Sequence, residues 1–308
     1  MVYCAHDSIY AQEILDAFQE KTGIPVWVRY DTEATKSLSL VEQLVREKDA
    51  PRCDVFWNNE LLGTMDLADR GMLEPYKGVG FARIPEAFKD TQARWVGFAA
   101  RLRVYIVNTG KLEPTADAVR AALLGDLSRV ALAKPLYGTT LTHYTVLSET
   151  WGLPKLKSWH EDLRRRGIRE VTGNATVKNL VAEGVCDLGF TDSDDFFVAK
   201  DEGKPVAMLP VRLGDGRVIS IPNAVCIVKG TRRLEWARKL VDYVLSEEVE
   251  LALANSKSRQ VPLGPVDAER LSDEVRELAR WANDRYPLGS LGQARADCLG
   301  WLKSEYLK

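Results

Sequence analysis

The chemistry that this sequence offers is concentrated in one short acidic stretch, VCDLGFTDSDDFF, which runs from Val185 to Phe197. An apolar, strand-like segment ends there in three carboxylates, those of Asp192, Asp194 and Asp195, and two phenylalanines follow. Because ligands of α/β domains bind beyond the carboxyl ends of parallel strands, these side chains are placed to line a binding site. Asp and Ser are also common helix caps, and a helix that begins near Asp194 explains the same residues without any ligand.

Further polar side chains follow two strand-like segments near the N-terminus. His6 ends the segment VYCAH, and an imidazole can bind a metal or form a hydrogen bond with an anion. The sequence Trp57-Asn58-Asn59-Glu60 offers amide and carboxylate oxygens in a row. Helix capping is the structural alternative at both places, by the residues after His6 and by Asn59. Capping is also the first explanation for a third polar turn, which contains Asp31, Thr32, Glu33, Thr35 and Ser37.

Basic and hydroxyl side chains farther along the chain are suited to an anion. Arg101 and Arg103 stand two apart in a predicted strand, so both point to one face and can bind an anion by bidentate hydrogen bonds. One of them can instead pair with an acidic neighbour. Thr139 and Thr140 open a predicted helix, where hydroxyls and backbone N–H groups form a small cradle for an oxyanion or a carboxylate. Asn174 caps the next predicted helix, and its side chain can contact the same ligand.

Catalytic motifs are absent from the sequence. It contains no GxSxG, HExxH or GxxxxGK[ST] pattern, and no cysteine has a matched histidine context. His143 and His160 stand beside aromatic residues in helical sequence, which is typical of packing or surface positions. The aspartates are compatible with an acid–base pair, but no motif indicates a substrate for one. We therefore expect a binding protein and not an enzyme.

Length and charge limit the class of protein. A chain of 308 residues with 45% hydrophobic residues favours two domains, because single cores stop growing at roughly 250–300 residues. The 42 basic and 44 acidic residues leave no positive excess for a nucleic acid. No apolar run reaches the ~18 residues of a membrane span. The five cysteines are widely spaced, which is typical of buried core residues. If the protein is exported, one or two disulfides can form among them.

Alternating strand and helix patterns must position these side chains. VYCAH leads into a helical segment that Gly23 closes, IPVWVRY into a second helix, and CDVFW into a third that Gly71 closes. Three such units predict a parallel sheet with helices on both faces. The same order resumes with VALAKP, IREV and the acidic stretch, and the sequence after residue 234 is mainly helical.

Two long strand-like runs interrupt this order, WVGFAARLRVYIVN and VISIPNAVCIVK. Runs of this length can carry the chain from one domain into another and back. We therefore expect two lobes, one of residues 1–100 plus 226–280 and one of residues 101–225 plus 281–308, with a ligand cleft between them that closes on binding. Met1 stands directly before the first predicted strand, which we interpret as a mature domain whose export signal segment is absent from this sequence.

These motifs, in this order, resemble the periplasmic substrate-binding proteins of bacterial ABC transporters, extracellular solute-binding protein family 1, in the group that includes ferric-iron-binding proteins. The resemblance runs from VYCAHDS and EKTGIPV through CDVFWNNELLGTMDLADRGMLEPY, WVGFAARLRVYIVNTG and ALAKPLYGTTLTHYTVLSETWG to AEGVCDLGFTDSDDFF. It implies a type II α/β fold in which each lobe is a mostly parallel sheet flanked by helices and two crossover strands join the lobes. It also implies a periplasmic or otherwise extracytoplasmic monomer that delivers a small ligand or metal ion to an ABC permease.

The resemblance implies ligand roles as well. In the ferric group a histidine, an acidic residue and two adjacent tyrosines hold the metal, and here His6 matches the histidine, Asn59 the acidic position with Glu60 adjacent, and Asp194 and Asp195 the tyrosines. A companion anion is held in that group by an arginine and by hydroxyl groups. The matching residues in this sequence are Arg101, Thr139 and Thr140, with Asn174 nearby.

Replacement of the tyrosine pair by aspartates leaves the identity of the cargo open. Phenolates are strong ferric ligands, whereas carboxylates also suit Ca²⁺, Mg²⁺ or Mn²⁺. We predict a cationic cargo, a metal ion first and ferric iron by resemblance, with His6, Glu60, Asp194 and Asp195 as metal ligands and a companion anion. The alternatives are an organic cation held by the acidic pair with Trp57, Phe196 and Phe197, or a ligand sensor of the same fold.

Overall fold

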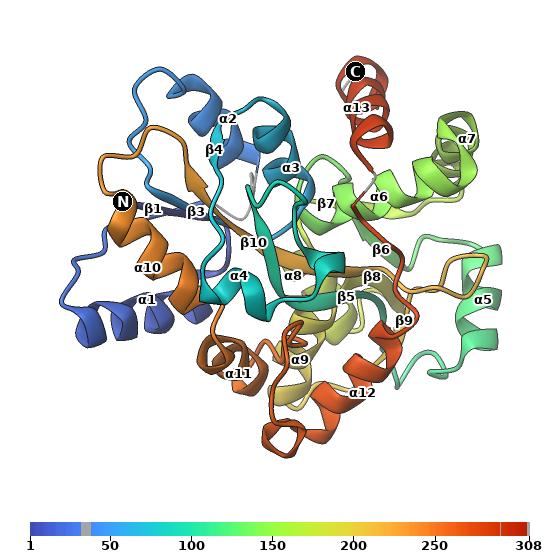
Figure 1. The fold of residues 1–308 in the computed structure, drawn as a ribbon. Coiled ribbons are helices and arrows are strands. Elements are labelled where there is room, and N and C mark those ends of the chain that lie inside the picture. Colours follow the sequence, from blue (N-terminus) through green and yellow to red (C-terminus); the bar gives the residue numbers. More distant parts are fainter. Residues whose placement is uncertain (32–37, 290, 307–308) are drawn as a thin grey trace. The chain divides into compact units, whose positions relative to one another are not determined.

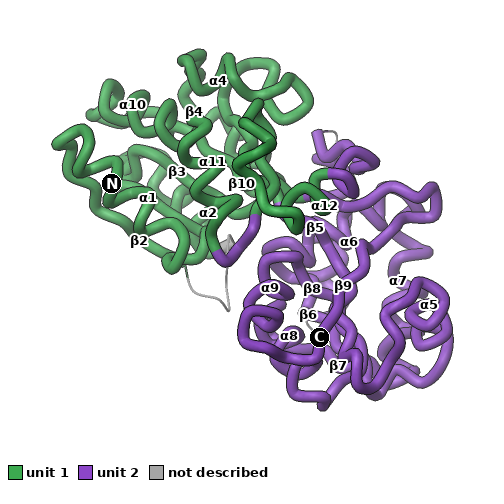
Figure 2. The backbone as a smooth tube through the Cα atoms, turned by 90° about the horizontal axis from the view of Figure 1, so that it is seen from below, with its two compact units in different colours: residues 1–100, 221–256, 260–279 green, residues 101–220, 257–259, 280–308 purple. Residues whose placement is uncertain are grey.

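The computed structural model describes residues 1–31, 38–289 and 291–306, and the chain divides into two compact units (Figure 2). The first unit comprises Met1–Ala100, Ile221–Ser256 and Gln260–Ala279, and the second comprises Arg101–Ser220, Lys257–Arg259 and Arg280–Lys308. Four residues of the predicted polar turn, Thr32, Glu33, Thr35 and Ser37, lie outside the described residues.

The first unit contains a parallel sheet of three strands with β1 (Val2–Cys4) in the middle. Strand β2 (Val28–Tyr30) pairs with one side of β1 and strand β3 (Val55–Asn58) with the other. Helices α1 (Ser8–Thr22), α2 (Leu38–Arg46) and α3 (Leu62–Asp69) follow the three strands in turn, which confirms the predicted strand–helix order (Figure 1). Gly23 ends α1 with φ 68°, a left-handed conformation that glycine adopts without steric cost.

Antiparallel strands extend this sheet. Strand β10 (Ser220–Val228) pairs with β3 and with the short strand β4 (Leu73–Glu74). Beyond these strands the first unit holds α4 (Val79–Arg83), α10 (Leu234–Val244), α11 (Glu247–Asn255), the short helices η2 (Glu86–Phe88) and η3 (Ala268–Arg270), and most of α12 (Asp273–Ala282).

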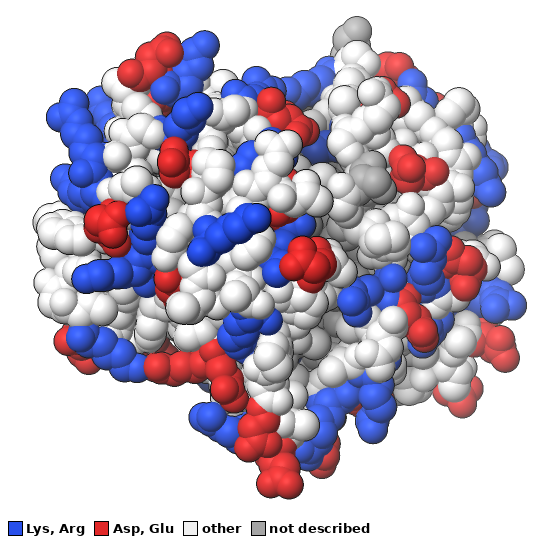
Figure 3. Space-filling view, viewed as in Figure 1, with Lys and Arg blue, Asp and Glu red and all other residues white. Residues whose placement is uncertain are grey.

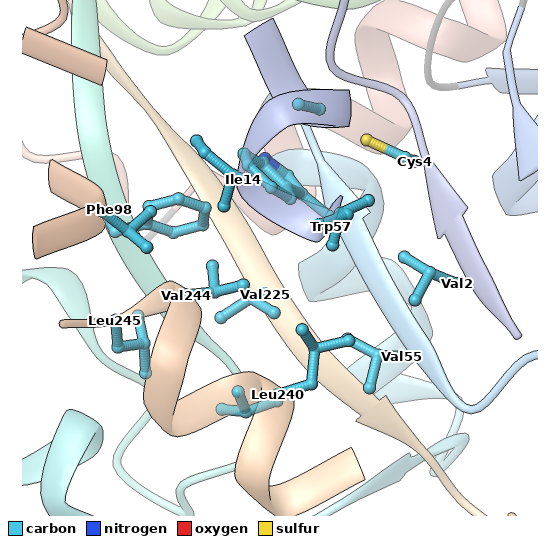
Figure 4. Close-up of a cluster of buried hydrophobic side chains, with 14 of the residues drawn as sticks. Val2, Cys4, Ile14, Val55, Trp57, Phe98, Val225, Leu240, Val244 and Leu245 are labelled. Carbon is cyan, nitrogen blue, oxygen red and sulfur yellow. The ribbon is translucent and has the colours of Figure 1, made fainter. Parts of the chain in front are cut away.

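Apolar side chains from the strands and from α1 and α10 form the core of the first unit. Figure 4 shows Trp57, Phe98 and Val225 gathered with Val2 and Leu240, and all five are buried. Burial of each large side chain of this kind stabilises the fold by about 1.5–3 kcal/mol. The core therefore fixes where β1 and β3 end, and with them the positions of the polar residues that follow both strands.

Two strands carry the chain between the units, as the long apolar runs predicted. Strand β5 (Val96–Asn108) belongs to the first unit up to Ala100 and to the second from Arg101 onward. Strand β10 returns, with Ser220 in the second unit and its remaining residues in the first.

The second unit is built around β6 (Val130–Ala133). Parallel strands flank β6, with β7 (Arg169–Val171) on one side and β8 (Leu188–Asp192) on the other, and β5 runs antiparallel to β8 and to β9 (Val206–Pro210). Helices α6 (Gly138–Trp151), α8 (Asn174–Ala182) and α9 (Ser193–Asp201) each begin soon after one of the parallel strands. Parallel strands end at one edge of a sheet, so the first residues of these helices come together there. The unit also contains α5 (Ala116–Leu124), α7 (Leu153–Arg165), α13 (Gly292–Trp301) and the π-helix η4 (Leu302–Tyr306).

Among the described residues, no helix is long and apolar enough to cross a membrane. All five cysteines are buried, which fits their interpretation as core residues. On the face shown in Figure 3, basic and acidic side chains are interspersed, in agreement with the balanced charge of the sequence.

Candidate functional site

The acidic stretch forms the junction between β8 and α9 in the second unit. Asp192 is the last residue of β8 and precedes the first residue of α9, but its side chain makes no capping hydrogen bond to that helix. Capping therefore does not explain Asp192. One carboxylate oxygen from each of Asp192, Asp194 and Asp195 can be chosen so that all lie within 4.8 Å of one another.

Three side chains from other elements donate to the Asp192 carboxylate. Arg103 Nη1 lies 2.7 Å from Oδ1, and Thr139 Oγ1 and Asn174 Nδ2 lie 2.5 and 3.0 Å from Oδ2. Arg103 comes from β5, where it is the register partner of Asp192, and Thr139 and Asn174 come from the starts of α6 and α8. We call Asp192 and these three donors the Asp192 network. Hydrogen bonds to a charged group are stronger than neutral ones, so the network holds this carboxylate in place.

Arg101 lies on the same face of β5 as Arg103, as their spacing predicted. Its Nε atom is 3.7 Å from Asp192 Oδ2 and 3.7 Å from Asp194 Oδ2, and its side chain is 3% exposed. Both arginines thus pair with carboxylates of the acidic stretch. The sequence had suggested such pairing with an acidic neighbour for only one of them. Three carboxylates with two guanidinium groups leave one net negative charge in the cluster.

Smaller contacts complete the group of Asp192, Asp194 and Asp195, which we call the acidic cluster. Thr140 Oγ1 donates to Asn174 Oδ1 at 3.2 Å, and Thr191 Oγ1 donates to Asp195 Oδ2 at 2.9 Å. The Asp195 backbone N–H donates to Asp194 Oδ1 at 3.1 Å. All predicted site residues of the second unit therefore meet in one place: Arg101, Thr139, Thr140, Asn174, Asp192, Asp194 and Asp195.

Sequence reasoning missed Thr191 as part of this site. Its position directly before Asp192, where β-strand alternation turns its side chain to the other face, gave no reason to expect a contact with Asp195. The contact arises because α9 begins at once after β8 and brings residue i+4 back to Thr191.

In the first unit His6 lies in an aromatic environment at the end of β1. Its ring stacks with those of Tyr10 and Trp57, at centroid distances of 5.7 and 5.6 Å, and His6 is 3% exposed. The Gln260 amide donates to His6 Nε2 across 3.2 Å. Gln260 in turn accepts from Asn223 at 2.8 Å. Neither Gln260 nor Asn223 was identified from the sequence, because both are distant from His6 along the chain.

Glu60 serves as a helix cap. Its carboxylate accepts from the backbone N–H of Leu62 at 2.6 Å and of Gly63 at 2.8 Å, where the first N–H groups of α3 have no partner within the helix. Asn58 Nδ2 donates to the same carboxylate at 3.2 Å. Capping was the structural alternative for this turn, and the Glu60 carboxylate provides it; Asn59 is also buried.

The aromatic side chains near the predicted site residues are used within the fold. Trp57 is 1% exposed and packs against His6 and Phe98. Phe196 and Phe197 are buried, and the guanidinium of Arg259 lies 4.7 Å from the centroid of the Phe197 ring. Within the described part of each unit, Trp57, Phe196 and Phe197 therefore do not form an exposed aromatic site for an organic cation.

Comparison with known proteins defines the class. Residues 2–255 match the family described as bacterial extracellular solute-binding protein, and the chain belongs to that family. Its fold is the two-lobed type II periplasmic-binding-protein fold, shared with iron-bound HitA from Pseudomonas aeruginosa at a TM-score of 0.85, with 21% identity over 98% of this chain and 97% of that one. Family and fold are those of solute-binding transport proteins, not of enzymes.

Two further relatives show the range of cargo names. The chain is 23% identical over 301 residues to iron uptake protein A1 from Synechocystis sp., covering 92% of this chain and 80% of that protein. It also resembles the structure of the periplasmic binding protein AfuA from Actinobacillus pleuropneumoniae with fructose-6-phosphate bound, at a TM-score of 0.79 and 19% identity, covering 100% of this chain and 98% of that one.

Proposed function

We propose that this solute-binding protein captures a hard metal cation, ferric iron first, outside the cytoplasm and delivers it to an ABC permease. The observation that carries the proposal is the approach of one oxygen each from Asp192, Asp194 and Asp195 to within 4.8 Å of one another. Hard cations take oxygen ligands, and carboxylates are the commonest protein source of them. The names of HitA and of iron uptake protein A1 support iron as the first choice.

The three aspartates have different roles in this proposal. Asp192 is held by Arg103, Thr139 and Asn174, whereas Asp194 and Asp195 stand in the first turn of α9. We assign the direct contacts with the cation to Asp194 and Asp195. Their carboxylates are the groups that stand in for the tyrosine pair of the ferric group.

Asp192 takes the place that we expected for a companion anion. Thr139 and Asn174 were predicted to help hold that anion, yet both donate to Asp192. An external anion at the same donors would meet the charge of this buried carboxylate, which is unfavourable at short range. We propose that Asp192 is an internal counter-anion and that binding of the cation needs no companion anion from solution.

His6 and Glu60 remain predicted ligands of the first unit. His6 Nε2 accepts from Gln260, and the Glu60 carboxylate holds the start of α3. A ligand role for either residue would replace these contacts. We therefore expect substitutions at His6 and Glu60 to weaken cargo binding less than substitutions at Asp194 and Asp195.

The proposal is tested by thermal unfolding with separate candidate ligands. A ligand that binds only the native state at a hundred times its Kd stabilises that state by about 2.7 kcal/mol. The panel is ferric citrate with citrate alone as control, Mn²⁺, Ca²⁺, choline and fructose 6-phosphate. We expect a metal to raise the melting temperature and choline and fructose 6-phosphate to leave it unchanged. A shift with either organic compound and with none of the metals would show that the cargo is not a metal ion.

A further inference from the structure

The second unit contains a cavity of about 630 Å³, which we call the α5 cavity. It is lined by residues of β5, α5, α6, α7 and β8 and by the segment 209–214. Its volume falls within the range of roughly 300–1,000 Å³ that is usual for small-molecule sites. None of its lining residues belongs to the acidic cluster or the Asp192 network.

One part of the lining of the α5 cavity is an apolar face of helix α5. Ala116, Val119 and Leu123 line the cavity together with Leu124, at the spacing of one side of a helix. Val119 is the buried residue of α5, and Leu124 is 75% exposed. Helices of soluble proteins normally bury such a stripe against another element, and here part of the stripe also lines the cavity.

Helix α6 contributes a buried polar group to the lining. His143, Leu147 and Trp151 are spaced by four residues along α6 and line the cavity. His143 is 2% exposed, and its Nδ1 has no hydrogen-bond partner within the described part of the chain. Burial, with the nearby positive charge of Arg103, holds the pKa of His143 well below its usual range, so the ring is neutral. The neutral ring therefore adds no charge to this part of the cavity lining.

Positive charge exceeds negative charge around the α5 cavity. Arg120, Arg166 and Arg212 line it, and the one acidic lining residue is Asp162. Asp162 is already bonded by Arg166 at 3.1 Å and also accepts from Arg165. Arg120 and Arg212 are exposed. The surroundings therefore favour a ligand that has an anionic group as well as an apolar body.

We propose that the α5 cavity is a second binding site of this protein and that it takes an amphipathic monocarboxylate. The apolar body of the ligand lies against the α5 stripe, with Trp151 and Trp159 on the other side. Its carboxylate lies toward Arg120 and Arg212, where an arginine can form charge-assisted hydrogen bonds. The site uses residues of the second unit alone and does not depend on the identity of the cargo.

Isothermal titration of the full chain with decanoate tests this site, and decanol is the uncharged control. We expect one decanoate per chain, bound at least about tenfold more tightly than decanol because of the charge-assisted contacts. Equal binding of the two compounds, or no binding of decanoate, would overturn the proposal.

Two variants, each with a matched control, locate the bound molecule. Ala116→Trp places a large side chain in the cavity from an exposed helix position, and we expect it to abolish decanoate binding. Val79→Trp adds the same side chain at a residue that is 78% exposed outside the cavity lining, and should bind like the parent. The double variant Arg120→Gln/Arg212→Gln should remove the preference for decanoate over decanol, and Arg232→Gln, an exposed residue outside the cavity lining, should keep it. Unchanged binding by Ala116→Trp would show that decanoate binds elsewhere.

Discussion

Arg103 and Asp192 form a buried ion pair, with 2.7 Å between Nη1 and Oδ1 and side chains that are 0% and 5% exposed. The two residues are also direct partners in the register of β5 and β8. The backbone pairing thus determines which carboxylate the arginine meets, and the Asp192 network forms around that pair.

Arg103→Met leaves the Asp192 carboxylate buried without its main charge partner. Removal of one member of a buried ion pair destabilises a protein by about 3–5 kcal/mol, and we expect a loss of this size in urea unfolding. Arg70 pairs with Asp66 on the surface of the first unit, with a side chain that is 53% exposed. Arg70→Met is the control and should cost no more than about 1 kcal/mol. Equal losses for both variants would mean that the Asp192 network is not a stabilising element.

Asp192→Asn tests whether Asp192 acts as an internal counter-anion. The amide keeps the size of the side chain but removes its charge, so an anion from solution can then be held by Arg103 and Thr139. We expect added bicarbonate or phosphate to raise the affinity of this variant for the cation at least about tenfold, which corresponds to about 1.4 kcal/mol. The parent protein should respond little to the same anions. If the parent binds the cation only with an added anion, Asp192 does not have this role.

Gly63 and Gly300 provide a matched pair of glycine-to-alanine substitutions in helices. A Cβ at Gly63 would lie 2.8 Å from Glu60 Oε1 and 2.9 Å from Val41 Cγ2, so the capping carboxylate would have to move. We expect Gly63→Ala to destabilise the protein by about 1–3 kcal/mol. Gly300 lies in α13 with nothing within 4 Å of its added Cβ, and Gly300→Ala should stabilise by about 0.5–1 kcal/mol. Chemical denaturation measures both, and a neutral Gly63→Ala would contradict the close approach of Glu60.

Stability should fall in mild acid because of His143. Burial lowers the pKa of His143 in the folded state, while its unfolded value is about 6.5. Below that pH the unfolded chain binds a proton that the folded chain does not, so the free energy of unfolding decreases as pH falls from about 6.5 toward the folded pKa. His160, whose pKa is also lowered by burial, acts in the same direction. We measure the free energy of unfolding in urea between pH 7 and 5 for His143→Phe and for the parent. This free energy should change less with pH in the variant, and an equal change in both proteins would argue against a buried neutral ring.

The strand and helix order of both units could be predicted because it depends on local patterns. Apolar spacing and the glycines after helices, such as Gly23, act within a few residues of each other, and the structure confirms them. The edge at which Thr139, Asn174 and Asp192 meet could also be expected, because parallel strands end together. The same reasoning predicted that Arg101 and Arg103 share a face.

The partners of these side chains could not be predicted in the same way. Arg103 and Asp192 are separated by 89 positions in sequence, and a charged residue has the same local signature whether it meets an internal carboxylate or an external anion. The first N–H groups of α3 are bonded by the Glu60 carboxylate. Sequence spacing could not predict this contact, because it depends on how far the side chain of each neighbouring polar residue reaches. Contacts of this kind are determined by tertiary packing.

Metal content of the purified protein tests the central claim most directly. The measurement is the number of ferric ions retained per chain after loading with ferric citrate and gel filtration, for the parent and for Asp194→Asn/Asp195→Asn. Our account predicts about one ion per chain for the parent and almost none for the variant, because oxygen ligands that lose their charge bind hard cations far more weakly. Equal iron content in the two proteins, or none in the parent, would contradict a metal site at the acidic cluster.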